Sequence, residues 1–384
     1  MPKTFSAALR RAVRLMHPAK VKKATLSAQK AMAGIVVKLA GAKAKPVRFK
    51  QPTPALPKGG RSLGVVLEQL RAAQAFLPAA QAFLPAARAG SNTSKVSPRI
   101  PTGAQYLSRN HRNAAGSRGY KLYLPISSAS PKGLILMLHG CNQTPDDFAV
   151  GTHMNALAEK HGLAIAYPAQ TRRHNAASCW NWFNPANQAR GAGEPEMLAA
   201  LARKLMQEFR LDRNSVFVAG LSAGGAMAAI LADLYPDVFS AAGIHSGLAR
   251  GAASDVLSAI TAMRSGRPSG GNTPHATAHP DPVRRIVFHG EADATAHRSN
   301  ASFIVRAALG DHASPTKVNK RSVLGRGYTR SEFAAADGTG LLELWMVEGA
   351  GHAWSGGRAK GSYTDPKGPD ASLQMVRFFL AKPG

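Results

Sequence analysis

Residues 215–229 carry the sequence SVFVAGLSAGGAMAA, a pattern typical of a sharp turn between a buried strand and a helix. The apolar residues before Gly220 predict the strand, and the alanine-rich run after Gly225 predicts the helix. Small residues at Gly220 and Gly224 let the backbone pack closely, so that the Ser222 hydroxyl projects above a sheet. The stretch therefore indicates a nucleophilic serine, although G-x-S-x-G by itself arises by chance in glycine-rich chains.

Predicted strands and helices alternate along the chain after residue 100. Strands are predicted over residues 120–125, 133–140, 163–168, 215–219, 239–244, 285–290 and 341–347. Helices are predicted over residues 147–161, 196–209, 299–309 and 371–380. Most of these strands are continuous apolar runs, which is typical of parallel strands buried on both faces. The fold class is therefore predicted to be α/β, with ligands bound at the carboxyl ends of the strands.

Two segments of this domain differ from that pattern. Residues 120–125 alternate between apolar and polar side chains and end at a proline, which predicts an edge strand. Residues 246–282 are small, polar or rich in Gly and Pro, and they give no firm secondary-structure prediction.

The first hundred residues have a different composition from the rest. They hold nineteen lysines and arginines against one acid, Glu68, and so carry most of the formal net charge of +28. Large apolar residues recur at helical spacing between Phe5 and Met16, which predicts a basic amphipathic helix suited to an anionic granule or membrane surface. A solvated tail without a specific role is the alternative. We therefore expect a basic arm and linker over residues 1–100 and an α/β domain over residues 101–384.

Several classes of partner and site are not expected. Phe5 and Phe49 are the only aromatic residues before position 60, so specific nucleic-acid recognition is not predicted. Cys141 and Cys179 are too few for a paired-cysteine zinc site, and they are either buried thiols or one disulfide. No secretory signal is visible, because the first apolar stretch lies late and is interrupted by Lys38. On this ground we expect a cytoplasmic or granule-associated protein.

A serine nucleophile needs a general base and an acid that orients the base. Asp293 directly follows one predicted strand, and His352 lies in a glycine-rich loop after the last predicted strand. Both follow Ser222 in the chain order usual for α/β-hydrolases, so we expect these three residues to form a catalytic triad. Glu291 is the competing acid, and we favour Asp293. For His352 the alternative is an ordinary surface histidine.

The oxyanion formed during acyl transfer needs two preset backbone donors. We expect these to be the amide of Ala223, next after Ser222, and the amide of Cys141, in the loop after strand 133–140. His139 precedes the serine in the chain and is expected to brace this loop, as His289 is expected to brace the acid loop. These residues require neither a metal nor an organic cofactor.

Five sequence blocks follow one another in a fixed order. They are LHGC at 138–141, CWNWF at 179–183, GAGEP at 191–195, GLSAGGAM at 220–227 and GHAWSGG at 351–357. Together they resemble the poly(3-hydroxybutyrate) depolymerase family of esterases over roughly residues 118–382. The resemblance implies an α/β-hydrolase that cleaves short-chain polyhydroxyalkanoate esters through an acyl-enzyme, with Ser222, Asp293 and His352 at the matching positions.

The same resemblance carries further implications. It suggests that Cys141 and Cys179 form a disulfide, and that Trp180 and Trp182 wall the cleft for an aliphatic polyester, with core packing as the alternative for the tryptophans. Secreted members usually have a signal peptide and a substrate-binding domain after the catalytic domain, and neither pattern is found here. The resemblance thus implies an extracellular location, whereas the basic arm suggests an anchor on intracellular polymer granules.

Two other functions remain open at this point. Relatives of the predicted domain include feruloyl and acetyl-xylan esterases, so a carbohydrate-linked or other small ester is the alternative substrate. A basic protein that only binds a granule or membrane surface is the alternative of another class. The complete set of Ser222, Asp293 and His352 argues against it, because binding alone needs no nucleophile, base and acid together.

Overall fold

The computed structural model describes residues 96–126, 130–266, 282–311, 313–322 and 325–381. The predicted arm, residues 1–100, lies almost wholly outside this part, so the division of the chain at residue 100 stays a prediction. Within the described residues no helix has both the length and the apolar character needed to cross a bilayer.

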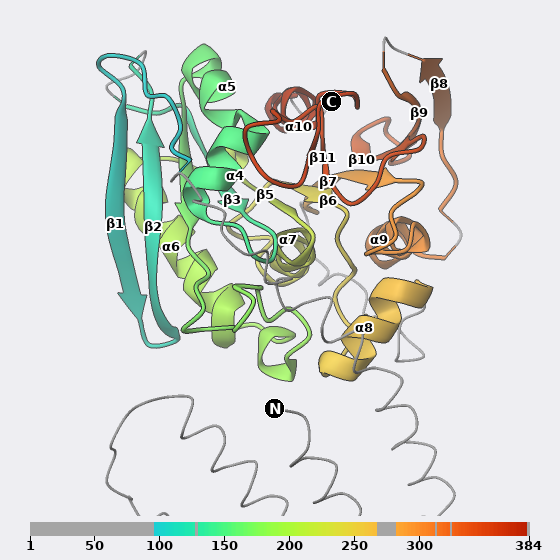
Figure 1. Ribbon diagram of the computed structural model, residues 1–384, viewed down its shortest axis with the longest axis horizontal. Helices are drawn as coiled ribbons and strands as arrows, with labels where there is room; N and C mark the ends of the chain where they lie inside the picture. Colours follow the sequence, from blue (N-terminus) through green and yellow to red (C-terminus); the bar gives the residue numbers. More distant parts are fainter. Residues whose placement is uncertain (1–95, 127–129, 267–281, 312, 323–324, 382–384) are drawn as a thin grey trace, which may run out of the picture. The chain divides into compact units, whose positions relative to one another are not determined.

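A ten-stranded sheet runs through the described domain (Figure 1). Its order is β1-β2-β4-β3-β5-β6-β7-β10-β9-β8. The strands are β1 Gln105–Asn113, β2 Gly116–Leu124, β3 Gly133–Leu138, β4 Leu163–Pro168, β5 Val216–Leu221, β6 Ala241–His245, β7 Arg284–Gly290, β8 Lys317–Ser322, β9 Gly327–Ala334 and β10 Gly340–Val347. The six neighbouring strands from β4 to β10 pair in parallel, and the outer strands at both edges pair antiparallel. The mostly parallel sheet confirms the predicted α/β class.

The helices form a layer on each face of this sheet (Figure 1). One layer consists of α4 Pro145–Thr152, α5 Met154–His161 and α10 Ala371–Leu380. The other consists of α6 Gly193–Phe209, α7 Ala223–Leu234, α8 Val256–Ser265 and α9 Ser299–Leu309. The remaining short elements are the 3-10 helices η1 Pro185–Asn187 and η2 Arg213–Ser215 and the two-stranded pair β11 Trp354–Ser355 and β12 Thr364–Asp365. The central strands are buried on both faces because each face packs on a helix layer.

The predicted helix over residues 147–161 is in fact two helices. His153 adopts a left-handed conformation (φ 56°, ψ 22°) that ends α4, and α5 begins at the next residue. The Thr152 carbonyl accepts a hydrogen bond from the Ser372 hydroxyl of α10 at 2.6 Å. A hydrogen bond from α10 therefore satisfies the backbone carbonyl at this break, and the local sequence does not reveal this contact.

The edges of the sheet also differ from the predictions. Residues 120–125 were expected at an edge, but β1 pairs along the whole of β2 and forms the edge itself. The sequences QYLSRNHRN of β1 and KVNKRS of β8 are polar because edge strands bury little surface, so apolar periodicity does not reveal them. The unassigned segment 246–282 contains α8, and its residues 267–281 lie outside the described part.

Candidate active site

Ser222 occupies the sharp turn between β5 and α7, with φ 57° and ψ −118°. Positive φ is rarely adopted by a residue with a side chain, and such strain is typical of functional turns. A Cβ at Gly224 would press on the Leu138 carbonyl, with 2.6 Å to its carbon, so only glycine allows the turn to approach β3. The Ser222 amide donates to the carbonyl of His245 at 2.9 Å, which ties the turn to the end of β6.

Asp293 and His352 form a hydrogen-bonded pair. The Nδ1 of His352 lies 2.7 Å from Oδ2 of Asp293, and the amides of Thr295 and Ala296 donate to Oδ1 at 2.9 and 2.8 Å. Burial raises the pKa of Asp293, but the hydrogen bond and charge of His352 and the amide bonds lower it more, so the net pKa lies below the usual range. The carboxylate therefore keeps Nδ1 of neutral His352 protonated and leaves Nε2 able to accept a proton. Asp293, and not Glu291, contacts the histidine.

The three predicted triad residues lie in loops at one edge of the sheet. They follow β5, β7 and β10, which are parallel, so their carboxyl ends share that edge. His245 joins the loops: its carbonyl accepts from Ser222, and its Nε2 accepts from the amide of Ser355, just after His352, at 3.0 Å. Among the described residues Ser222 and His352 share no hydrogen bond, and such a bond often forms only when substrate is bound.

The predicted oxyanion donors lie beside Ser222. Cys141 and Ala223 line the same cavity as the serine, and neither amide has an acceptor among the described residues. Ala223 is the first residue of α7, whose positive end therefore faces the reacting oxygen. Both amides are thus free to donate a hydrogen bond beside Ser222, and their role as oxyanion donors stays a prediction.

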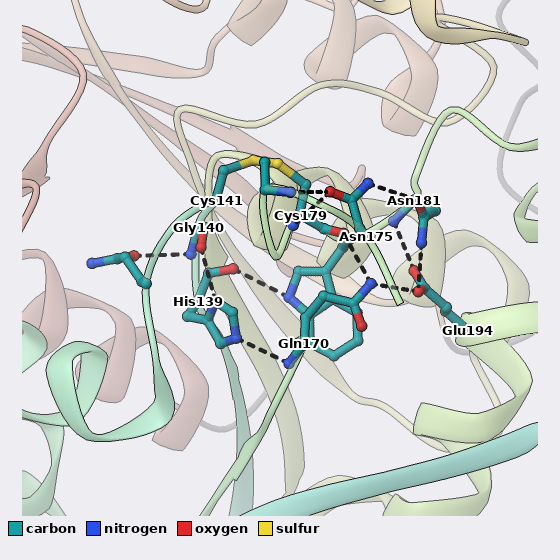
Figure 2. Close-up of a disulfide and its surroundings, with 11 residues drawn as sticks. His139, Gly140, Cys141, Gln170, Asn175, Cys179, Asn181 and Glu194 are labelled. Carbon is teal, nitrogen blue, oxygen red and sulfur yellow. Dashed lines mark hydrogen bonds between the residues drawn. A yellow bond between two sulfur atoms is a disulfide. The ribbon is translucent and has the colours of Figure 1, made fainter. Parts of the chain in front are cut away.

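Two hydrogen bonds of His139 and a disulfide hold the loop that carries Cys141 (Figure 2). His139 is fully buried; its Nδ1 donates to the Gly140 carbonyl at 2.8 Å, and its Nε2 accepts from the amide of Gln170 at 3.1 Å. Cys141 and Cys179 are joined in a disulfide, which confirms the predicted pairing. In the acid loop, Nε2 of His289 contacts the Ala296 carbonyl at 2.8 Å, in the bracing position expected for it.

The two predicted tryptophans lie in different places. Trp182 lines the cavity at Ser222, and its contact with a substrate stays a prediction. Trp180 is fully buried and is not part of that lining; its indole Nε1–H donates to the His139 carbonyl at 3.1 Å. The expectation that Trp180 walls the cleft is therefore wrong, because its indole is buried against the backbone of His139.

A cavity of about 290 Å³ opens at Ser222. Its lining consists of Cys141, Asn175, Ala176, Ala177, Cys179, Trp182, Phe183, Ser222, Ala223, Leu248, Val256, Ala259, Ile260 and Met263. None of these side chains is charged, and most are apolar. Four of them come from α8, which we did not predict, although the apolar residues at 256, 259, 260 and 263 have helical spacing. Within the described residues no His, Cys, Asp or Glu cluster is arranged to hold a metal ion.

A family model described as "Esterase PHB depolymerase" matches residues 118–310, which is half of the chain. The chain belongs to this esterase family. Its domain is thus that of a carboxylic ester hydrolase, in agreement with the arrangement at Ser222.

Relatives of this PHB depolymerase-family esterase are named for different substrates. Poly(3-hydroxyalkanoate) depolymerase C of Paucimonas lemoignei is 29% identical over 240 residues, or 60% of this chain and 57% of the relative. The probable acetylxylan esterase A of Aspergillus clavatus is 29% identical over 55% of this chain and 71% of the relative. Feruloyl esterase B of Neurospora crassa is 32% identical over 33% of this chain and 43% of the relative. The chain thus spans little more than half of the depolymerase's length.

Among solved structures, the acetyl xylan esterase from Aspergillus awamori matches with a TM-score of 0.54 at 22% identity. The match covers 65% of this chain and 93% of the other. This likeness supports the α/β-hydrolase fold of the family member and does not bear on its substrate.

Proposed function

We propose that the protein is a serine esterase that hydrolyses short-chain polyhydroxyalkanoates such as poly(3-hydroxybutyrate). The observation that carries the substrate choice is the cavity at Ser222, whose lining holds no charged side chain. An aliphatic acyl group offers mainly apolar surface, so it gains from burial in such a lining. Trp182 is proposed to contact this group. Membership of the esterase PHB depolymerase family supports the same reading.

The proposed reaction has two halves. Ser222 Oγ attacks the ester carbonyl while Nε2 of His352 takes its proton, and Asp293 stabilises the resulting imidazolium through the 2.7 Å bond to Nδ1. The amides of Cys141 and Ala223 bind the negative oxygen, and collapse of the intermediate releases the alcohol, which receives the proton from His352. Water then attacks the acyl-serine by the same route and frees the acid and the enzyme.

A carbohydrate ester is the second candidate substrate. The comparisons support it as well as they support a polyester, because acetylxylan and feruloyl esterases are among the relatives. The two candidates share the proposed chemistry at Ser222 and differ in the alcohol that leaves.

Hydrolysis of four substrates separates these candidates: amorphous poly(3-hydroxybutyrate) granules, p-nitrophenyl butyrate, acetylated xylan and methyl ferulate. We expect activity on the first two, and loss of both in Ser222→Ala. Ser240→Ala is the matched control, because this buried hydroxyl bonds the Val216 carbonyl at the start of β5, and it should retain activity. Activity on xylan or ferulate without granule activity would reject the polyester. Full activity of Ser222→Ala would reject the serine mechanism.

We further propose that residues 1–100 are a separate basic arm that holds the enzyme on an anionic polymer-granule or membrane surface. The support is the charge of this segment, nineteen lysines and arginines against one acid. Removal of residues 1–100 should lower the fraction that sediments with granules, and added salt should lower it for the full chain. Equal sedimentation of the full chain and of the protein without residues 1–100 would reject the proposed anchoring role of the arm. If the full chain bound granules and hydrolysed none of the four substrates, the protein would instead be a binding protein.

A further inference from the structure

Hydrogen bonds through Gln170 connect the oxyanion loop, defined as residues 139–141, to a buried acid that the proposed mechanism does not use (Figure 2). Glu194, in the first turn of α6, is 7% exposed. Its Oε1 accepts from Arg118 at 2.9 Å, from the Gln170 amide group at 2.6 Å and from Asn181 Nδ2 at 2.9 Å, while its Oε2 accepts from the Asn181 backbone at 2.7 Å. Burial of a carboxylate costs desolvation free energy unless hydrogen bonds compensate it, so this carboxylate holds its donors in fixed positions.

One of these donors leads directly to the oxyanion loop. The Gln170 side-chain amide donates to Glu194 and, at 2.9 Å, to the Cys179 carbonyl, while its oxygen accepts from Arg118 Nε at 3.1 Å. Gln170 is thereby fixed at both ends of its amide, and its backbone N–H meets Nε2 of His139 at 3.1 Å. Because Nε2 accepts this bond, the proton of the neutral His139 ring must be on Nδ1.

The His139 ring in turn sets the direction of one peptide group. Its Nδ1–H donates to the Gly140 carbonyl oxygen at 2.8 Å. That oxygen belongs to the same planar peptide as the N–H of Cys141, and in a trans peptide the two point in opposite directions. A hydrogen bond that fixes the Gly140 oxygen therefore also aims the Cys141 N–H. Burial lowers the pKa of His139 to about 4, so the neutral ring persists at neutral pH.

The loop has a second attachment, the disulfide between Cys141 and Cys179. We propose that Glu194 is a positioning residue that aims the Cys141 amide through Gln170 and His139, and that it shares this task with the disulfide. The inference rests on the proposed serine-esterase function. Glu194 itself touches no substrate, because the cavity lining does not include it.

The test is the kinetics of the full chain on p-nitrophenyl butyrate after Glu194→Gln. An oxyanion donor acts on the transition state, so kcat should fall about tenfold while KM stays within about twofold. Asp233→Asn is the control, because Asp233 is also buried and pairs with Arg285 at 2.6 Å and Arg250 at 3.1 Å, near the end of α7. It should lower the thermal midpoint to a similar extent and keep kcat. Equal kcat losses in both variants, or none in Glu194→Gln, would overturn the proposal.

A double variant tests whether the acid and the disulfide hold the same loop. Cys179→Ser alone should lower kcat about fivefold. If the two changes acted independently, the double variant with Glu194→Gln would lose about fiftyfold, the product of the fivefold and tenfold losses. We expect a much larger loss in kcat, because each attachment supports the loop when the other is missing. A loss equal to that product would refute the shared task. If Glu194→Gln does not fold, Gln170→Met replaces it in the test, because this change leaves the Arg118–Glu194 pair in place. An unchanged kcat in Gln170→Met would then refute the path from Glu194 through Gln170 and His139 to the Cys141 amide.

The outcome for Ser222 separates the two proposals. An active Ser222→Ala protein would remove the proposed function and this inference with it. An inactive Ser222→Ala protein beside a Glu194→Gln protein of normal kcat would leave the serine esterase standing and overturn only the role of Glu194.

Discussion

Substitution of Gly224 by alanine should damage stability and catalysis together. A Cβ at this position would press on the Leu138 carbonyl and lie 2.7 Å from the His139 oxygen, where ordinary contact begins at 3.4 Å. All of the nearest atoms are backbone, so no side chain can rotate away, and the end of β3 must move. We expect a loss of about 3 kcal/mol in the free energy of unfolding, the upper part of the usual range for overpacking.

The kinetic effect follows from which backbone moves. The displaced segment leads into Gly140 and Cys141, so the proposed oxyanion amide shifts and kcat should fall about a hundredfold. Urea unfolding and p-nitrophenyl butyrate kinetics measure the two effects. Gly340→Ala is the matched control, since a Cβ there meets nothing within 4 Å. If Gly224→Ala behaved like Gly340→Ala in both assays, the close approach of the turn to β3 would be wrong.

Three other changes have defined outcomes. Trp180→Phe keeps an aromatic ring but leaves the buried His139 carbonyl without its donor, and it should cost about 1–3 kcal/mol in urea unfolding; wild-type stability would contradict that bond. Reduction of the disulfide, whose cysteines are 38 residues apart, should cost about 4 kcal/mol on the chain-entropy estimate, and an unchanged midpoint under reductant would count against it. The pKa of Asp293 is lowered on folding, so its carboxylate stabilises the protein above the unfolded pKa of about 3.9, and this stability is lost as the pH falls through the folded pKa. As the pH falls, the free energy of unfolding should therefore decrease less steeply for Asp293→Asn than for the wild type, and equal slopes would contradict the lowered pKa.

Local chemistry made much of the site predictable. Ser222 sits between an apolar strand and a helix, and Asp293 and His352 follow later strands, so chain order and the parallel sheet place all three at one edge. The strand sequences of β3, β4 and β5 were equally informative, because burial on both faces demands uninterrupted apolar residues.

Residues whose role depends on distant partners were not predictable in this way. Trp180 and Trp182 are separated by one residue, yet one supports the His139 carbonyl and the other lines the cavity. The sequence CWNWF makes the two side chains look alike, and only the path of the chain around the disulfide places one in the core and the other in the cavity. The same holds for Glu194, whose buried bonds to Arg118, Gln170 and Asn181 cross long stretches of chain.

The sequence alone thus determined the α/β class, the chain order of the three residues proposed as nucleophile, acid and base, and the concentration of positive charge in the first hundred residues. These properties depend on periodicity, residue type and chain order, which are local. The tertiary structure decided the break at His153, the choice of Asp293 over Glu291, the α8 wall of the cavity and the bonds that hold Cys141. Each of these depends on which residues, far apart in the chain, the folded sheet brings within contact distance.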